Sequence, residues 1–209
     1  MAEVSLRDLN LTTEETDLLM TVIKNTADVS EEQLKRLAII LVNKGTSDAG
    51  TICGAICMAE NRNIFRKFLL RALQTSYQSH VDSEYKNENE WFCLVGFLCA
   101  FFDFVRVGNL PLMVLIKPIT NALWELSQRK YFGNQKAIAC LANNLKLIGK
   151  SLDRLNRHKM NELFAQVEKC FLSSESSPQS RLRLLEVVEC RCGGWKLNQS
   201  AVDFYRKAC

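Results

Sequence analysis

The sequence predicts an all-α protein built from pairs of helices that recur along the chain. Helix-start signals and apolar stripes with three- and four-residue spacing alternate over most of the 209 residues. Only nine glycines and three prolines interrupt these patterns. No segment shows the period-two alternation flanking Asn-Gly or Asp-Gly that is typical of a β-hairpin. These three observations favour helices throughout.

The first pairs of helices have the clearest start signals. Thr12–Glu15 and Ser30–Gln33 each match a capping box, in which two side chains satisfy free N–H groups at the first turn. Apolar residues at helical spacing follow both boxes. A break at Gly45–Ser47 precedes a short helix expected over about Asp48–Glu60, and a further apolar stripe begins at Ile64. The first two pairs therefore begin near residues 13 and 47.

The longest apolar run, Trp91–Phe102, predicts an enclosed helix and not a membrane span. A spanning helix needs about 20 apolar residues, and this run is shorter. A helix that is apolar around its whole circumference is a buried one. The run lies in the third pair, where a stack of pairs offers neighbours on both sides. We expect Trp91–Phe102 to be helical and mostly buried, with no lipid-facing stripe.

Glycine and proline residues set the expected boundary after this run. Gly108-Asn109 is expected to end the helix, and Leu110-Pro111 is expected to start the next one. Pro118 would lie inside that sixth helix and kink it. The remaining helices are expected over residues 135–155, 159–172, 178–192 and 199–207.

The predicted pairs begin near residues 13, 47, 90, 134 and 178. Two helices in about 40–47 residues is the period of HEAT-type repeats. The sequence therefore predicts one domain over residues 1–209, a HEAT-like solenoid of about five antiparallel helix pairs. Because the pairs share a pattern and few identical residues, an irregular all-α domain stays the alternative.

Composition and motifs argue against an enzyme or a metal protein. The formal net charge of +4 is modest, and the nine cysteines lie mostly in apolar helical patterns, which favours a reducing compartment without disulfides. Neither Cys53-x3-Cys57 nor Cys190-x-Cys192 has common zinc spacing. No nucleophile elbow, phosphate loop or dinucleotide fingerprint occurs. We expect no catalytic residue, metal ligand or cofactor.

Basic residues form three groups that could contact phosphates or an acidic peptide. The same groups could equally be solvated surface. They comprise Arg62, Arg66, Lys67 and Arg71; Lys150, Arg154, Arg157, His158 and Lys159; and Arg181, Arg183, Arg191 and Lys196.

Two short patterns at helix ends are expected to orient one helix pair against the next. Asp103 and Arg106 are three residues apart, so they can pair, and Arg106 can also reach the free carbonyls of the helix. Glu189 and Arg191 place a charge pair next to Trp195 around a helix stop at Gly193–Gly194.

The two patterns resemble the middle domain of the initiation factor 4G (MIF4G) family. The resemblance is carried by the stretches FDFVRVGNLPLMVLIKPI and LLEVVECRCGGWK. Two further stretches fit it, RKFLLRALQTSYQ and KMNELFAQVEKCFL. The resemblance covers roughly Thr13–Tyr205. The chain is most similar to the small stand-alone branch, which partners the histone-messenger stem-loop-binding protein. The matching positions are Asp103, Arg106, Asn109, Pro111, Glu189, Arg191 and Trp195.

The resemblance implies a crescent of five helix pairs that binds proteins without catalysis. It implies an adaptor in translation initiation that bridges stem-loop-binding protein to translation initiation factors, forms a homodimer, and works in the cytoplasm and nucleus away from membranes. Two alternatives are a module that binds RNA through basic helix faces and a scaffold for DEAD-box RNA helicases from another branch. The cap-binding and poly(A)-binding sites of the large scaffold members are not expected.

The partner surface is expected on the second repeat. Arg66, Lys67 and Arg71 share its second helix. In HEAT-type stacks that helix commonly lines the concave side, so we predict that these three residues contact the partner.

Overall fold

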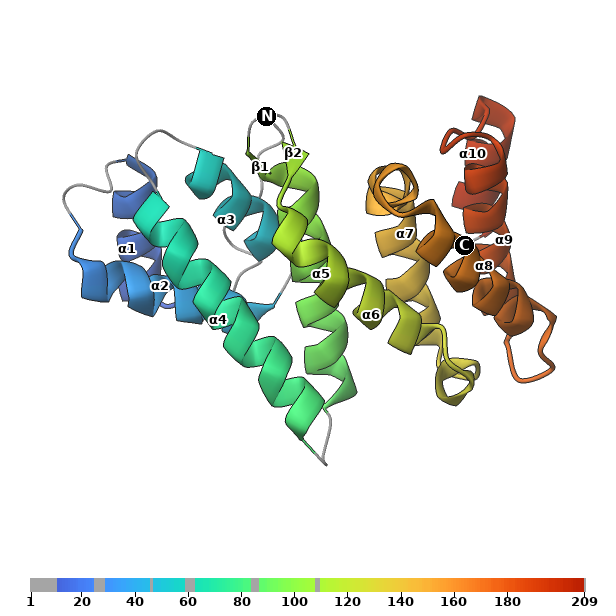
Figure 1. Cartoon of the computed structure of the whole chain (residues 1–209), viewed down its shortest axis with the longest axis horizontal. Helices are drawn as coiled ribbons and strands as arrows, with labels where there is room; N and C mark the ends of the chain where they lie inside the picture. Colours follow the sequence, from blue (N-terminus) through green and yellow to red (C-terminus); the bar gives the residue numbers. More distant parts are fainter. Residues whose placement is uncertain are drawn as a thin grey trace. The chain divides into compact units, whose positions relative to one another are not determined.

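Helices make up most of the described part of the computed structural model, which confirms the all-α class (Figure 1). The structure describes residues 11–24, 29–45, 47–58, 63–83, 87–107 and 110–208. The chain divides into two units, Met1–Leu115 and Ile116–Cys209.

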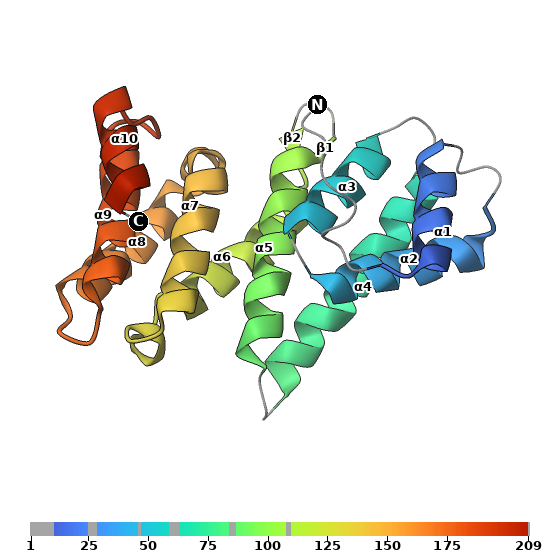
Figure 2. The same cartoon turned by 180° about the vertical axis from the view of Figure 1, so that it is seen from behind.

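The first unit consists of two layers of helices followed by a short hairpin. α2 packs on α4, and α3 packs on α5; in both views of the molecule α3 lies beside α5 (Figures 1 and 2). Contact between helices two apart in order is typical of stacked helix pairs. The elements are α1 (Thr13–Lys24), α2 (Glu31–Lys44), α3 (Ser47–Met58), α4 (Asn63–Asp82), α5 (Glu88–Phe104), β1 (Arg106–Val107), β2 (Leu110–Pro111) and the 3-10 turn η3 (Met113–Leu115).

The second unit repeats the same packing order. α7 packs on α9, while α6 packs on α8. The elements are α6 (Ile116–Leu126), the 3-10 turn η4 (Arg129–Tyr131), α7 (Gln135–Leu155), α8 (Arg157–Leu172), α9 (Pro178–Cys192) and α10 (Gln199–Ala208). The predicted third pair has its first helix, α5, in one unit and its second, α6, in the other. A single domain of five repeats stays a prediction.

Both predicted capping boxes form. Thr12 accepts a hydrogen bond from the Glu15 backbone N–H through its hydroxyl, and its own N–H donates to the Glu15 carboxylate. Ser30 and Gln33 make the same reciprocal pair at the start of α2. Each box satisfies two N–H groups that the first helical turn leaves without an acceptor. The starts of α1 and α2 are therefore fixed by their own sequence.

The apolar run becomes the core of the first unit. Trp91–Phe102 lies within α5, and most of its side chains are buried, with Cys93 the exposed exception. This confirms the expected enclosed helix. Among the described residues, no helix has the length and apolarity needed to cross a membrane.

The segment after α5 differs from the prediction. α5 ends at Phe104, and a two-stranded antiparallel hairpin pairs Arg106 with Pro111 and Val107 with Leu110. Gly108 and Asn109, the expected helix stop, lie outside the described residues. The Arg106 guanidinium donates to the carbonyls of Phe102 (2.8 Å) and Val105 (3.1 Å), so it satisfies carbonyls that a longer helix would have used.

Helix α6 begins later than expected. It starts at Ile116, so Pro118 is its third residue. The N–H groups in the first turn of a helix have no acceptor inside the helix, so a proline there removes no helical hydrogen bond. The expected kink within a helix that starts at Leu110 was therefore wrong.

Candidate protein-interaction site

A cluster of polar contacts around Asp153 joins α7 to the end of α9 in the second unit. We call it the Asp153 clasp, and it consists of Asp153 on α7, Arg191 in the last turn of α9 and Trp195 just beyond that helix. Arg191 binds the two carboxylate oxygens of Asp153 through Nε (3.1 Å) and Nη2 (2.8 Å). The Trp195 indole Nε1–H donates to Asp153 Oδ2 at 2.9 Å. The clasp thus joins α9 to the preceding helix pair, as the sequence pattern predicted, although through Asp153 and not through Glu189.

Helix α8 completes the surroundings of the clasp. Arg191 Nη2 also donates to Asn161 Oδ1 at 2.7 Å, and its guanidinium lies 4.3 Å from the ring centroid of Phe164. Phe164 meets the Trp195 ring edge to face, with centroids 6.0 Å apart. A guanidinium that is both paired and stacked is well fixed in position. These contacts assign Arg191 and Trp195 to the folding of the second unit.

A tight backbone turn places Trp195. Gly194 and Trp195 have φ angles of 69° and 65°, in the left-handed region. Such a φ is common for glycine and rare for a large side chain. The Trp195 N–H donates to the Cys190 carbonyl at 2.7 Å, which is the kind of bond that closes a helix C-terminus. The strained backbone at Trp195 is compensated by the bonds of its indole ring.

The clasp lowers the pKa of the Asp153 carboxyl group. Burial alone would raise the pKa of its carboxyl group, but hydrogen bonds from Arg191 and Trp195 and the charges of Arg191 and Arg157 outweigh burial and lower the pKa below its ordinary value. The folded state therefore binds this proton less readily than the unfolded chain does. The resulting stabilisation is complete above the unfolded pKa of about 3.9 and is lost as the pH falls through the lower folded pKa.

The pH dependence of this stabilisation is measurable with the variant Asp153→Asn. The wild type should be more stable than the variant at neutral pH, and the difference should shrink steadily below about pH 4 as Asp153 takes up a proton. Urea unfolding at a series of pH values gives both curves. A stability difference that stays constant from pH 7 down to pH 2.5 would show that folding does not lower the pKa of Asp153.

Asp103 and Arg106 lie where the sequence placed them, at the end of α5. Arg106 Nη2 is 3.9 Å from Asp103 Oδ1, while Arg106 Nη1 makes the shorter bonds to helix carbonyls. Burial raises the pKa of Asp103, and the charge of Arg106 only partly offsets this. Arg106 therefore acts mainly as a cap for α5. Of the other matching positions in this pattern, Pro111 lies in β2 and Asn109 lies outside the described residues.

The predicted partner residues share helix α4. Lys67 and Arg71 are exposed and one turn apart, while Arg66 beside them is half-buried. The other basic groups are partly used by the fold. Arg181 donates to the Ser173 carbonyl (2.7 Å), and Lys159 pairs with Glu162, in addition to Arg191 in the clasp. Arg62 lies outside the described residues.

Five exposed apolar side chains lie close together in the sequence around the hairpin, and we call them the hairpin surface. These residues lie in the hairpin and on either side of it, within residues 104–114, and their side chains are exposed to solvent. Val107 and Leu110 are direct cross-strand partners in it. Exposed apolar patches of this kind mark protein contact sites more often than scattered single residues do. Its members are Phe104, Val107, Leu110, Met113 and Val114.

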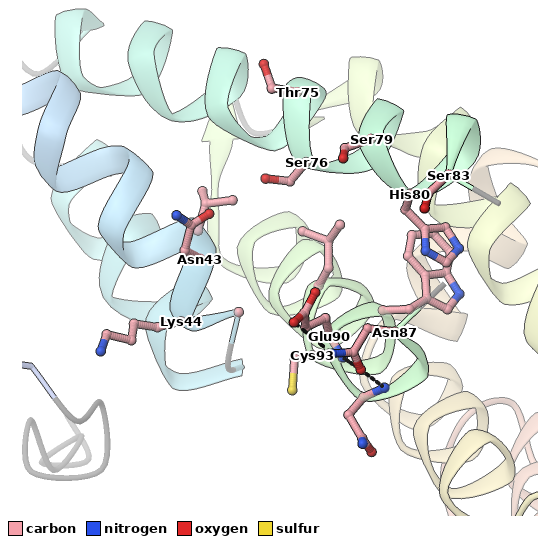
Figure 3. A pocket seen from close by; sticks show the side chains of 15 residues that line it. Asn43, Lys44, Thr75, Ser76, Ser79, His80, Ser83, Asn87, Glu90 and Cys93 are labelled. Atoms are coloured by element: carbon pink, nitrogen blue, oxygen red, sulfur yellow. Dashed lines mark hydrogen bonds between the residues drawn. The ribbon is translucent and has the colours of Figure 1, made fainter. Parts of the chain in front are cut away.

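A polar pocket of about 630 Å³ lies in the first unit, between the end of α2, one face of α4 and the start of α5 (Figure 3). Small hydroxyl side chains of α4 line it, among them Thr75, Ser76 and Ser79. This pocket was not predicted from the sequence. The available signal was the spacing of Thr75 and Ser79, one turn apart on α4, but only the structure places them opposite the ends of two other helices.

No group of His, Cys, Asp and Glu side chains suited to a metal ion occurs among the residues that the structure describes. The described cysteines are free thiols, and burial raises the pKa of Cys53 well above its ordinary value. Cys53 is therefore a core residue and a poor nucleophile.

Comparison with known proteins gives the family. The MIF4G domain matches residues 1–191, so the match ends at Arg191 of the clasp and Trp195 lies beyond it. "MIF4G domain-containing protein B" of Danio rerio is 35% identical over 199 residues, covering 90% of this chain and 88% of the relative. The human "MIF4G domain-containing protein" is 33% identical with the same coverage, and the mouse protein is 32% identical over 219 residues, covering 98% of this chain and 97% of its own length. The chain therefore belongs to the MIF4G domain family, whose domain is a helical protein-interaction domain and not a catalytic one.

Proposed function

We propose that this protein is a non-catalytic adaptor in translation initiation that bridges stem-loop-binding protein, bound to histone messenger RNA, to the translation machinery in the cytoplasm and nucleus. Family membership supports the adaptor role. The choice of partner rests on the resemblance of the stretch from Phe102 to Ile119 to the stand-alone branch. The observation that carries the partner site is the exposed pair Lys67 and Arg71 on α4, which suits an acidic segment of a partner.

A pull-down with purified stem-loop-binding protein tests this role. The wild-type chain should retain the partner at micromolar concentration, and the double variant Lys67→Glu, Arg71→Glu should weaken the complex at least tenfold because two attractive charges become repulsive. The double variant Lys35→Glu, Lys117→Glu makes the same charge change at other exposed positions and should bind normally.

Three outcomes separate the alternatives. If both double variants weakened the complex equally, the binding site on α4 would be wrong, while stem-loop-binding protein would still be the partner. Capture of a DEAD-box RNA helicase without stem-loop-binding protein would assign the chain to the other branch. Binding of single-stranded RNA that weakens steeply with salt, and more in the α4 variant than in the control, would favour the direct RNA-binding module.

We further propose that the protein is a homodimer joined through the hairpin surface. Five apolar side chains exposed within residues 104–114 support this, and Val114 is the most open of them at 67%. The double variant Val107→Asp, Val114→Asp should be monomeric by light scattering, since it would bury two carboxylates in an apolar contact. Val81→Asp, at an exposed apolar position on α4, is the matched control and should stay dimeric. A double variant that remains dimeric would contradict this interface.

A further inference from the structure

The loop between α8 and α9 contains a serine that is followed directly by a proline, Ser177-Pro178. The other two prolines of the sequence follow Leu110 and Lys117, so Ser177 is the one hydroxyl residue of the chain with proline next to it. Proline-directed protein kinases select this pair, because their substrate groove offers no acceptor for the backbone N–H after the target residue, and proline has no such N–H.

This loop lies at the surface of the second unit. Residues 173–177 form the tip that joins α8 to α9 in both views of the molecule (Figures 1 and 2). Ser174, Glu175 and Pro178 are exposed, and Ser177 is half-buried. Ser177 has an extended backbone, with φ −65° and ψ 156°, as the residue before a proline commonly does. A kinase binds its target residue in an extended chain, so only the first turn of α9 has to open, and terminal turns of helices fray readily.

An arginine without a carboxylate partner lies beside the loop. Arg181 follows Ser177 by one helical turn, and its Nη2 donates to the Ser173 carbonyl at 2.7 Å, so its guanidinium is bound to the same loop. Within the described ranges of the chain, Arg181 pairs with no carboxylate, and its Nε–H has no hydrogen-bond partner. The acid of the loop, Glu175, pairs instead with Arg129 at 2.9 Å. The positive charge of Arg181 therefore suits a phosphate at Ser177.

The first turn of α9 also suits a phosphate at this position. Ser177 is the N-cap of the helix: its Oγ accepts from the Ser180 N–H at 3.1 Å and donates to Ser180 Oγ at 3.1 Å. Phosphate oxygens accept the same hydrogen bonds, and the Ser180 hydroxyl can turn to donate to them. Their negative charge is favoured by the positive end of the helix dipole. Phosphorylation would thus replace a neutral cap of α9 by a charged one.

We propose that Ser177 is a phosphorylation site for a proline-directed protein kinase, and that its phosphate is held by the first turn of α9 and by Arg181. Ser177 Oγ attacks the γ-phosphorus of ATP, the bond from that phosphorus to the oxygen of the departing ADP breaks, and the hydroxyl proton passes to a base of the kinase. The phosphate strengthens the start of α9, whose last turn holds Arg191 of the Asp153 clasp. This site does not depend on which partner the protein binds.

Phosphorylation of the full chain tests the site. Incubation with a purified proline-directed kinase, ATP and Mg²⁺ should raise the intact mass by one phosphate, and fragmentation should place that phosphate on Ser177. Ser177→Ala should take up none. Pro178→Ala should also take up none, because it keeps the hydroxyl and a good helix former but removes the proline that the kinase selects. Ser174→Ala is the matched control: it removes an exposed serine of the same loop and should be phosphorylated as the wild type is.

Thermal unfolding tests how the phosphate is held. The phosphorylated chain should unfold at a higher temperature than the unmodified chain, and the gain should grow as the pH rises through about 6, where the phosphate loses its second proton. Arg181→Gln should still be phosphorylated but should show a smaller gain. Arg183→Gln removes a charge further along α9 and should keep nearly the whole gain.

Three results would contradict this site. The first is a full chain that takes up no phosphate on Ser177, whether or not a peptide of residues 171–184 is phosphorylated. The second is equal phosphorylation of Pro178→Ala and the wild type, which would mean that the proline is not recognised. The third is a lower unfolding temperature after phosphorylation, which would mean that α9 and Arg181 do not accommodate the phosphate.

Discussion

Replacing Asp153 by Ala is expected to lower the free energy of unfolding by about 3 kcal/mol. The substitution leaves the Arg191 guanidinium without its carboxylate and the Trp195 indole N–H without its acceptor. The Arg191 and Asp153 side chains are only 16% and 19% exposed, so water replaces the lost bonds poorly. Urea denaturation followed by circular dichroism measures this loss. The urea concentration at the midpoint of unfolding should fall, while the dependence of the unfolding free energy on urea concentration should not change.

A surface ion pair provides the control for this change. Asp203 lies 3.8 Å from Arg206, and their side chains are 48% and 72% exposed. Asp203→Ala should therefore change stability by less than about 0.5 kcal/mol, as exposed pairs generally do. If Asp153→Ala were equally harmless, the clasp would be a surface contact without influence on the fold.

Replacing Gly50 by Ala is expected to destabilise the first unit by about 2 kcal/mol, although alanine favours a helix. A Cβ atom at position 50 would lie 2.6 Å from the Phe97 carbonyl oxygen and 3.2 Å from its Cα atom. Both are backbone atoms of α5, so the added methyl group can be accommodated only if α3 and α5 move apart. Thermal unfolding of the variant should show a lower midpoint.

Gly96 on α5 provides a control, because the same substitution there should raise the stability of the protein. A Cβ atom there would meet nothing within 4 Å, and Gly96→Ala should stabilise the protein by about 0.5–1 kcal/mol through helix propensity alone. Stabilisation by both substitutions would mean that α3 and α5 are not in close contact at Gly50.

Local signals were sufficient for much of the secondary structure. Asn134 caps α7 and Pro178 occupies the first turn of α9, and both helices have the predicted bounds. The hairpin after α5 was not predicted, because its strands are two residues long and too short to show an alternation. At the end of α5 Arg106 bonds to the carbonyls of Phe102 and Val105, and these contacts depend on the backbone path that Arg106 itself follows.

The contacts of the clasp were only half predictable. The pattern at the end of α9 correctly gave Arg191 and Trp195 a role between helix pairs. Glu189 could not be the partner of Arg191, since residues two apart on a helix do not face each other. Asp153 had no distinguishing feature in the sequence, because its importance arises from a contact across 38 residues.

The clasp also constrains how the sequence can change over evolution. At Gly149 on α7 a Cβ atom would lie 2.1 Å from the outer edge of the Trp195 ring, and that ring cannot swing aside while its N–H is bound to Asp153. The identities of positions 149 and 195 are therefore linked. A lineage that acquires a side chain at position 149 must also reduce the one at position 195, because the two would otherwise clash.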